Sequence, residues 1–148
     1  MVGELRDLDT ISTALTAAET GHLVLATLHT RNAPQTIERI VDVFPAQQQP
    51  QIKLQLADCL QGIISQLLLP KAHGGGRVLA TEIMICNHAI RNLIREQHIS
   101  QIPSVMQSGA EAGNITMDKC LKELYKKGLI SKEIALTYAK DSHEFEQL

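Results

Sequence analysis

The sequence lacks several features that would assign it to common functional classes. No apolar run is long enough to span a bilayer, and the first residues lack the basic and then apolar pattern of a signal peptide. Lys and Arg number 14 against 16 Asp and Glu, so the formal net charge is −2 and offers no positive excess for nucleic acid or anionic lipid. We therefore expect neither nucleic-acid binding nor direct membrane insertion.

Cysteine is also scarce. The three cysteines, Cys59, Cys86 and Cys120, are widely spaced and never form the Cys-x-x-Cys pair of a zinc site. An odd number of separated thiols favours buried, reduced cysteines in a cytosolic protein over a disulfide framework. The sequence thus predicts no metal site and a cytoplasmic location.

What is present suits a folded chain. The 148 residues are enough for one domain with a modest core, and 44% hydrophobic with 20% charged residues indicates a globular protein rather than a disordered one. No internal repeat and no low-complexity segment interrupts the sequence. The function therefore has to be sought in individual segments.

A nearly unbroken apolar run, 23–28, organises the chain. Its length suits a strand, and a strand that is apolar on both faces is typical of a parallel sheet covered by helices. The run ends at His29. Ligands of open α/β sheets bind beyond the carboxyl ends of the strands, so this histidine is placed for chemistry. The alternative is a structural imidazole that only hydrogen-bonds at a strand end.

A second polar cluster precedes this run and contains Glu4. An apolar helix face begins at Leu8 and Gly21 can end the helix, while the carboxylate of Asp7 can accept an amide of its first turn. If residues 1–3 end a strand, the order strand, helix, strand makes the two strands parallel. Glu4 and His29 would then lie at the same edge of the sheet.

Periodicity and capping residues predict the middle of the chain. Asn32 and Pro34 begin a helix that Pro45 ends, and Pro50 opens another whose apolar positions continue in register to Ile63. Two β-rich runs follow with a glycine-rich turn between them, which predicts a hairpin. We expect its strands at about 63–69 and 78–85.

The last third is predicted to be helical. After Asn87 a helix would turn Ile90, Leu93 and Ile94 inward and leave Arg91, Asn92, Arg95 and Glu96 on the outward face. On the pattern alone, those charges are a solvated helix face. Beyond it we expect a loop at 107–114, helices capped by Thr116 and Ser131, and a fraying tail at 141–148.

Three ordered segments resemble the motifs of one superfamily. Val2-Gly-Glu-Leu-Arg-Asp7 resembles the end of the Walker B segment of the type II/type IV secretion ATPases, and 20–30 resembles their His box. Ala89-Ile-Arg-Asn-Leu-Ile-Arg-Glu96 is similar to the C-terminal signature of the PilT-like ATPases that retract type IV pili in twitching motility. The resemblance covers nearly the whole chain and is least distinctive after Asp141.

This resemblance implies an α/β fold. Residues 1–86 would be the C-terminal part of a RecA-like P-loop NTPase core, with the Walker B end, the His box and a β-hairpin, and residues 87–148 a helical C-terminal region. It also implies a hexameric ring in the full-length protein. Such a ring would be cytoplasmic, peripheral to the inner membrane at the pilus base, and would contact the inner-membrane platform protein of the pilus.

The resemblance also implies roles for the residues singled out. Glu4 would activate the attacking water and His29 would reach toward the γ-phosphate, with Arg6 and Asp7 as supporting residues. His22 belongs to the same box but precedes the strand, which favours a structural or subunit-interface role. The outward face of the helix after Asn87 would couple hydrolysis to retraction through a neighbouring subunit or a pilus-base protein; its residues are Arg91, Asn92, Arg95 and Glu96.

One part of such an enzyme is missing from the sequence. It contains no Gly-x-x-x-x-Gly-Lys-Ser/Thr, the P-loop that holds phosphate and magnesium. We therefore expect ATP and Mg²⁺ as cofactors of the full-length protein and no ATP binding by this chain alone. The alternatives are a non-catalytic module that docks on the pilus assembly machinery, or a fragment of a related secretion or pilus-extension ATPase, although extension ATPases typically carry a zinc pair that is absent here.

Overall fold

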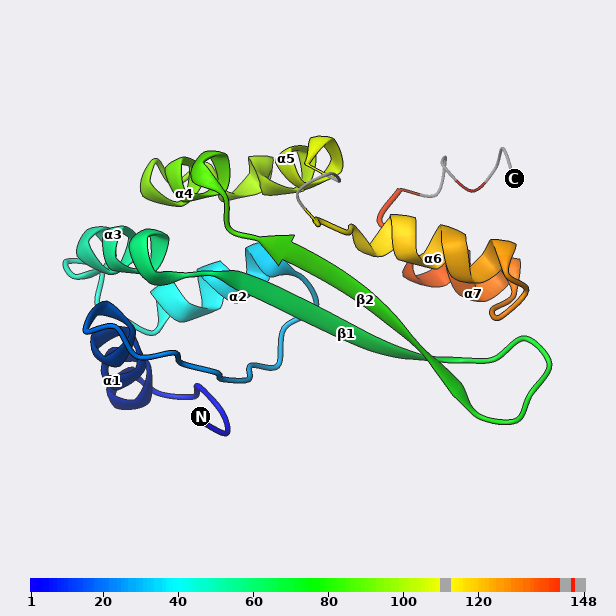
Figure 1. The fold of residues 1–148 in the computed structure, drawn as a ribbon, viewed down its shortest axis with the longest axis horizontal. Coiled ribbons are helices and arrows are strands. Elements are labelled where there is room, and N and C mark those ends of the chain that lie inside the picture. Colours follow the sequence, from blue (N-terminus) through cyan, green and yellow to red (C-terminus); the bar gives the residue numbers. More distant parts are fainter. Residues whose placement is uncertain (110–112, 142–144, 146–148) are drawn as a thin grey trace.

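The computed structural model describes residues 1–109, 113–141 and 145. Helices α1–α5 gather around one half of a long β-hairpin, and α6 and α7 lie beside its other half (Figure 1). The elements are α1 (Leu8–Glu19), α2 (Ala33–Asp42), α3 (Gln49–Cys59), β1 (Gly62–Pro70), β2 (Arg77–Ile85), α4 (His88–Arg95), a 3₁₀ turn (Ile99–Gln101), α5 (Ile102–Ser108), α6 (Met117–Lys126) and α7 (Lys132–Tyr138).

Side-chain caps determine where the helices begin. Asp7 accepts the backbone N–H of Thr10 at 2.8 Å at the start of α1, and the side chain of Asn32 accepts that of Gln35 at 2.9 Å at the start of α2. The same arrangement recurs at α4, α6 and α7. Each cap satisfies an amide that has no partner within its own helix, which is why the sequence predicted these starts correctly. The remaining caps are Asn87, Thr116 and Ser131.

The segment predicted to be a buried strand is extended but exposed. Leu23 is 80% and Leu25 is 58% exposed. One parallel bridge joins Val2 to Ala26, and the Val2 N–H donates to the Leu25 carbonyl at 2.8 Å. The two segments that flank α1 therefore run parallel as predicted, but they meet in one isolated bridge and neither forms a strand, and burial on both faces is wrong. A fully buried strand needs neighbouring strands and covering helices, which the described residues do not supply to this segment.

The hairpin forms where the sequence placed it. β1 and β2 pair antiparallel from Gly62 opposite Ile85 to Pro70 opposite Arg77, and the glycine-rich turn between them contains three glycines with positive φ. The preceding helix was predicted to stay in register to Ile63, but α3 ends at Cys59. Ile63 instead pairs in β1, because the hairpin supplies its backbone with partners across the strand.

Two hydrophobic cores lie along this hairpin. The first core collects buried residues from α1 to α5 and includes Met84 of β2, whereas the second core joins Leu69 and Ala80 of the hairpin to α6 and α7. Helix α4 contributes to the first core, so the domain boundary predicted after residue 86 stays a prediction. No helix in the described ranges is long and apolar enough to cross a membrane.

Two predictions for the C-terminal third need correction. The predicted loop 107–114 begins inside α5, and Asn114 is 1% exposed because its side chain accepts the backbone N–H of Ile85 at 2.8 Å. The tail was predicted to fray, yet Phe145 is fully buried in the second core. Residues 110–112, 142–144 and 146–148 of these segments lie outside the described residues.

The contrast in burial between strand and core can be measured. Ile37 of α2 is fully buried, so Ile37→Ala should lower the free energy of unfolding of this chain by about 2–4 kcal/mol. Leu25→Ala should change it by no more than about 0.5 kcal/mol, because Leu25 already faces solvent. Urea denaturation of both variants measures the difference. Equal losses would show that the 23–28 segment is packed in solution.

Candidate functional site

Glu4 contacts two side chains at the edge where the paired segments end. Its Oε1 lies 3.4 Å from Nε2 of His29, and its Oε2 lies 2.8 Å from Nε of Arg6. The Glu4 side chain is 27% exposed, whereas those of Arg6 and His29 are 75% and 85% exposed. The structure therefore brings together the acid and the histidine that the sequence placed at one sheet edge, with Arg6 and His29 both facing solvent.

The charge state of Glu4 follows from these neighbours. The hydrogen bond from Arg6 lowers the pKa of the Glu4 carboxyl below its ordinary value of 4.5, and the positive charges of Arg6 and His29 lower it further. Glu4 is accordingly ionised at neutral pH. A carboxylate with a low pKa accepts a hydrogen bond from water more readily than it removes the proton. This arrangement can orient and polarise a water molecule.

Backbone and hydroxyl contacts hold the two segments of this edge. The hydroxyl of Thr27 donates to the carbonyl of Gly3, which ties the histidine segment to the segment that carries Glu4. Beyond His29, the hydroxyls of Thr30 and Thr36 lie 2.6 Å apart, which fastens the chain to the first turns of α2. The position of His29 thus depends on its attachment at both ends.

Two of the predicted supporting residues are engaged in local contacts. Asp7 accepts hydrogen bonds from the backbone N–H and the hydroxyl of Thr10, and these bonds lower the pKa of its carboxyl. Nδ1 of His22 lies 3.2 Å from the carbonyl oxygen of Ala17 and 3.2 Å from the hydroxyl of Thr20, at the end of α1. Asp7 thus caps the start of α1 and His22 contacts its end. A role in the site stays a prediction for both residues.

The two arginines of α4 contact the end of α3, although Arg95 remains exposed and Arg91 is half-buried. Nη1 of Arg91 donates to the carbonyl of Ala57 and, at 2.8 Å, to that of Asp58, at the end of α3. Nη2 of Arg95 pairs with the carboxylate of Asp58. The last carbonyls of a helix have no N–H donors within it, and a guanidinium can donate to two of them at once. Packing of α4 on α3 therefore turns a predicted solvated face into a contact between helices.

The two other residues of that predicted face remain exposed. The side-chain oxygen of Asn92 accepts a hydrogen bond from Arg95 at 3.1 Å, and the carboxylate of Glu96 lies 3.6 Å from Nδ1 of His98. Their proposed contact with a partner stays a prediction.

Sequence reasoning missed one buried carboxylate, Glu82 of β2, which is 9% exposed. It accepts the backbone N–H of Ala33 at 2.7 Å. Burial raises the pKa of Glu82, while the hydrogen bond from the backbone N–H of Ala33 acts in the opposite direction. The available signal was a charge at an inward-facing strand position, since Ala80 and Met84 on either side are fully buried.

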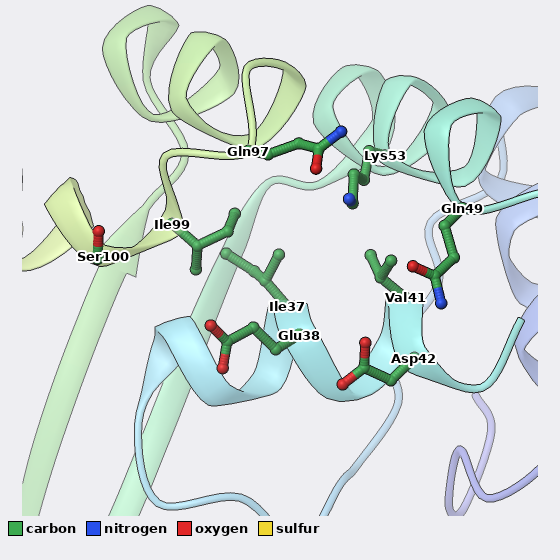
Figure 2. Close-up of a pocket in the computed structure, with 9 residues that line it drawn as sticks. All are labelled: Ile37, Glu38, Val41, Asp42, Gln49, Lys53, Gln97, Ile99 and Ser100. Atoms are coloured by element: carbon green, nitrogen blue, oxygen red, sulfur yellow. The ribbon is translucent and has the colours of Figure 1, made fainter. Parts of the chain in front are cut away.

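A groove of about 290 Å³ lies between α2, α3 and the segment after α4, and neither Glu4 nor His29 lines it (Figure 2). Its floor is apolar and its rim carries charges of both signs. The residues that form the floor and the charged rim are Ile37, Val41, Ile99, Glu38, Asp42 and Lys53.

Comparison with known proteins assigns the chain to a family. The family model described as "Type II/IV secretion system protein" matches residues 1–136. The chain belongs to this family. Across 145 residues it is 55% identical to the type IV pilus retraction ATPase PilT of Pseudomonas aeruginosa, covering 98% of this chain and 42% of that protein.

Further members of the type II/IV secretion family support the assignment. A twitching motility protein of Neisseria gonorrhoeae is 52% identical over 142 residues, covering 96% of this chain and 38% of its own length. The crystal structure of the pilus retraction motor PilT with bound ADP matches with a TM-score of 0.86 and 55% identity, covering 99% of this chain and 42% of that one. The α/β ATPase fold predicted from the sequence is thereby confirmed, and the chain spans about two fifths of the length of these relatives.

The contact between α4 and α3 predicts a loss of stability on removal of Arg91, whereas a solvated helix face would predict almost none. Arg91→Ala should lower the free energy of unfolding of this chain by about 1–2 kcal/mol, because the carbonyl of the buried Ala57 and the more exposed carbonyl of Asp58 lose their charged donor. Arg39→Ala, on an exposed position of α2, serves as the control and should cost no more than about 0.5 kcal/mol. Urea denaturation measures both. Equal, small losses would return Arg91 to the solvated face.

Proposed function

We propose that this chain is the C-terminal part of a hexameric ATPase motor that powers retraction of type IV pili. Residues 1–86 belong to the ATPase core and residues 87–148 to the helical C-terminal region. The observation that carries the proposal is the contact of Glu4 with His29 at the ends of two parallel segments. It occurs in a chain that is 55% identical to a retraction ATPase over nearly its whole length.

The proposed mechanism assigns one task to each residue of the site. Glu4, held ionised by Arg6, accepts a hydrogen bond from the attacking water and orients its lone pair. Nε2 of His29 contacts Oε1 of Glu4, whereas Arg6 contacts Oε2. The imidazole is therefore placed to contact the terminal phosphate that the water attacks. Phosphoryl transfer relies mainly on positioning and electrostatic stabilisation, which two oriented side chains can supply.

The residues of this chain can contact only the terminal phosphate end of the nucleotide, through Glu4 and His29. Neither the backbone cradle nor the lysine and hydroxyl of a P-loop occurs in the sequence. The described part of the chain also holds no group of three His, Cys, Asp or Glu that could bind a metal ion. Mg²⁺ would neutralise phosphate charge in the full-length protein, and ligands for it belong outside these residues.

The exposed apolar segment supports the proposal of a larger core. Leu23 and Leu25 are 80% and 58% exposed. They lie in an extended segment whose apolar composition is that of a strand covered on both faces. In the longer protein, further strands and helices would cover it. The full ring would lie on the cytoplasmic side of the inner membrane at the pilus base. There the exposed side chains of Asn92 in α4 and of Glu96, the residue after α4, are available to the platform protein or to a neighbouring subunit.

Nucleotide binding by the isolated chain is the first test. Isothermal titration of this chain with Mg-ATP should give no measurable heat of binding, because Glu4 and His29 address the terminal phosphate without a cradle for the rest. The full-length protein under the same conditions is the positive control. Micromolar binding by the isolated chain would contradict the proposal that most of the nucleotide is bound by residues outside this chain.

The role of Glu4 is tested in the full-length protein. Glu4→Gln should reduce ATP turnover by about a hundredfold or more while nucleotide binding is retained, because the change removes the charge that orients water but no phosphate ligand. Asp9→Asn, an exposed carboxylate in the first turn of α1, is the matched control and should leave turnover nearly unchanged. Steady-state ATPase assays and titration with a fluorescent nucleotide separate the two effects. Normal turnover by Glu4→Gln would exclude Glu4 as the activating residue.

A further inference from the structure

The mechanism above assigns no task to a pair of hydroxyls beside His29. Oγ1 of Thr30 lies 2.6 Å from Oγ1 of Thr36, in the first turns of α2. Thr36 is 5% exposed, so its hydroxyl is removed from water. Burial of a hydroxyl is costly unless it is hydrogen-bonded, and a valine of the same shape would fill this position without that cost. Packing alone therefore does not explain why a hydroxyl occupies this position.

The direction of each hydrogen bond follows from the number of protons available. A threonine hydroxyl has one proton to donate and two lone pairs that accept. The hydroxyl of Thr36 donates to the carbonyl of Asn32 at 2.9 Å, a contact that threonines inside helices commonly make. Its proton is thereby used, so Thr30 donates and Thr36 accepts at the 2.6 Å contact. Two hydrogen bonds in series thus join Thr30 to the residue that caps α2.

The start of α2 is a fixed part of the molecule. The side chain of Asn32 caps the helix. The carboxylate of Glu82 on β2 accepts the backbone N–H of Ala33 at 2.7 Å, and Ile37 in the following turn is fully buried in the first core. Thr36 therefore belongs to a helix start that is attached both to the hairpin and to the core.

The imidazole of His29, by contrast, lies largely in solvent. Its side chain is 85% exposed, and its Nε2 lies 3.4 Å from Oε1 of Glu4. On one side of His29 the hydroxyl of Thr27 donates to the carbonyl of Gly3, and on the other side Thr30 donates to α2. The peptide that carries the imidazole is therefore attached through threonine hydroxyls on both sides, and the second attachment leads to the fixed helix start.

We propose that Thr36 is a positioning residue that, through Thr30, holds His29 within reach of Glu4. Without an acceptor on Thr36, the hydroxyl of the half-buried Thr30 would turn to water and the histidine peptide would be attached on one side only. A misplacement of about 1 Å can cost a reaction about a hundredfold in rate. This role rests on the proposed ATPase function, and it makes the His box at 20–30 depend on a residue outside it.

Thr36→Val in the full-length protein removes the hydroxyl and conserves the shape of the side chain. It should lower the kcat of ATP hydrolysis about tenfold with an unchanged KM, because a displaced histidine affects the reaction rather than nucleotide binding. Its melting temperature should not fall, because the backbone N–H of Thr36 still bonds to the carbonyl of Asn32. Thr36→Ser restores the acceptor and should retain at least about half of the original kcat.

Three results with these variants would overturn the positioning role. They are a normal kcat in Thr36→Val, a melting temperature of that variant that falls together with its kcat, and a serine variant as slow as the valine variant. Thr13→Val is the matched control, because Thr13 of α1 also donates its hydroxyl to a carbonyl four positions earlier, that of Asp9 at 2.8 Å. This control should leave kcat unchanged, and a comparable loss would likewise overturn the role.

A double-mutant cycle tests whether the two hydroxyls act through each other. Thr30→Val should lower kcat about as much as Thr36→Val does, because either change removes the same hydrogen bond. The double variant should then be slower than the parent by about tenfold, as each single variant is. Losses that multiply to about a hundredfold would show that the hydroxyls act separately and would overturn the inference.

Backbone dynamics of this 148-residue chain test the attachment independently of catalysis. The ¹⁵N order parameters of residues 29–31 should be about 0.85 in the parent chain and fall below about 0.6 in Thr36→Val, while those of residues 10–19 in α1 stay unchanged. Low values in the parent chain, or values that do not change in the variant, would overturn the inference even if the full-length protein is an ATPase. Conversely, normal turnover in Glu4→Gln together with loosened residues 29–31 in Thr36→Val would reject the proposed function of the site and leave the attachment in place.

Discussion

The antiparallel pairing of β1 with β2 is the interaction on which the rest of this structure depends. The hairpin is long enough that one of its halves lies in the first core, through Met84, while Leu69 and Ala80 lie in the second. Both groups of helices therefore pack against side chains of the same hairpin. The same hairpin carries Glu82 to a place where its carboxylate accepts the N–H of Ala33 at the start of α2, so it positions a buried polar contact as well as the apolar cores.

The site at Glu4 and His29 depends on a second, much weaker pairing. A single bridge between Val2 and Ala26 makes the two segments parallel, and their ends therefore meet at one edge. This topological rule allowed the sequence to predict the contact of the acid with the histidine. It could not predict that the edge is open to solvent, because burial of a strand depends on neighbours that local periodicity does not report.

Failures of sequence reasoning share a physical cause. An arginine on the polar side of an amphipathic helix looks the same whether it meets water or the end of another helix, and Arg91 bonds to Ala57 across 34 positions of sequence. Phe145 lies in a polar tail whose pattern predicted fraying, yet it is fully buried in the second core. Glu82 and Ala33 are 49 positions apart, so the partner that makes a buried carboxylate acceptable was invisible from either residue.

What the sequence by itself determined is therefore local or topological. The caps at Asp7, Asn32 and Asn87 act on amides three positions away, so their residue types suffice to place the helix starts. The motifs that assign the family are likewise contiguous. Tertiary structure alone decided which helix end receives Arg91 and which main-chain groups surround Glu82. Those contacts depend on how separate elements pack, and a hydrogen bond between distant segments becomes possible only after burial of the two cores has brought them together.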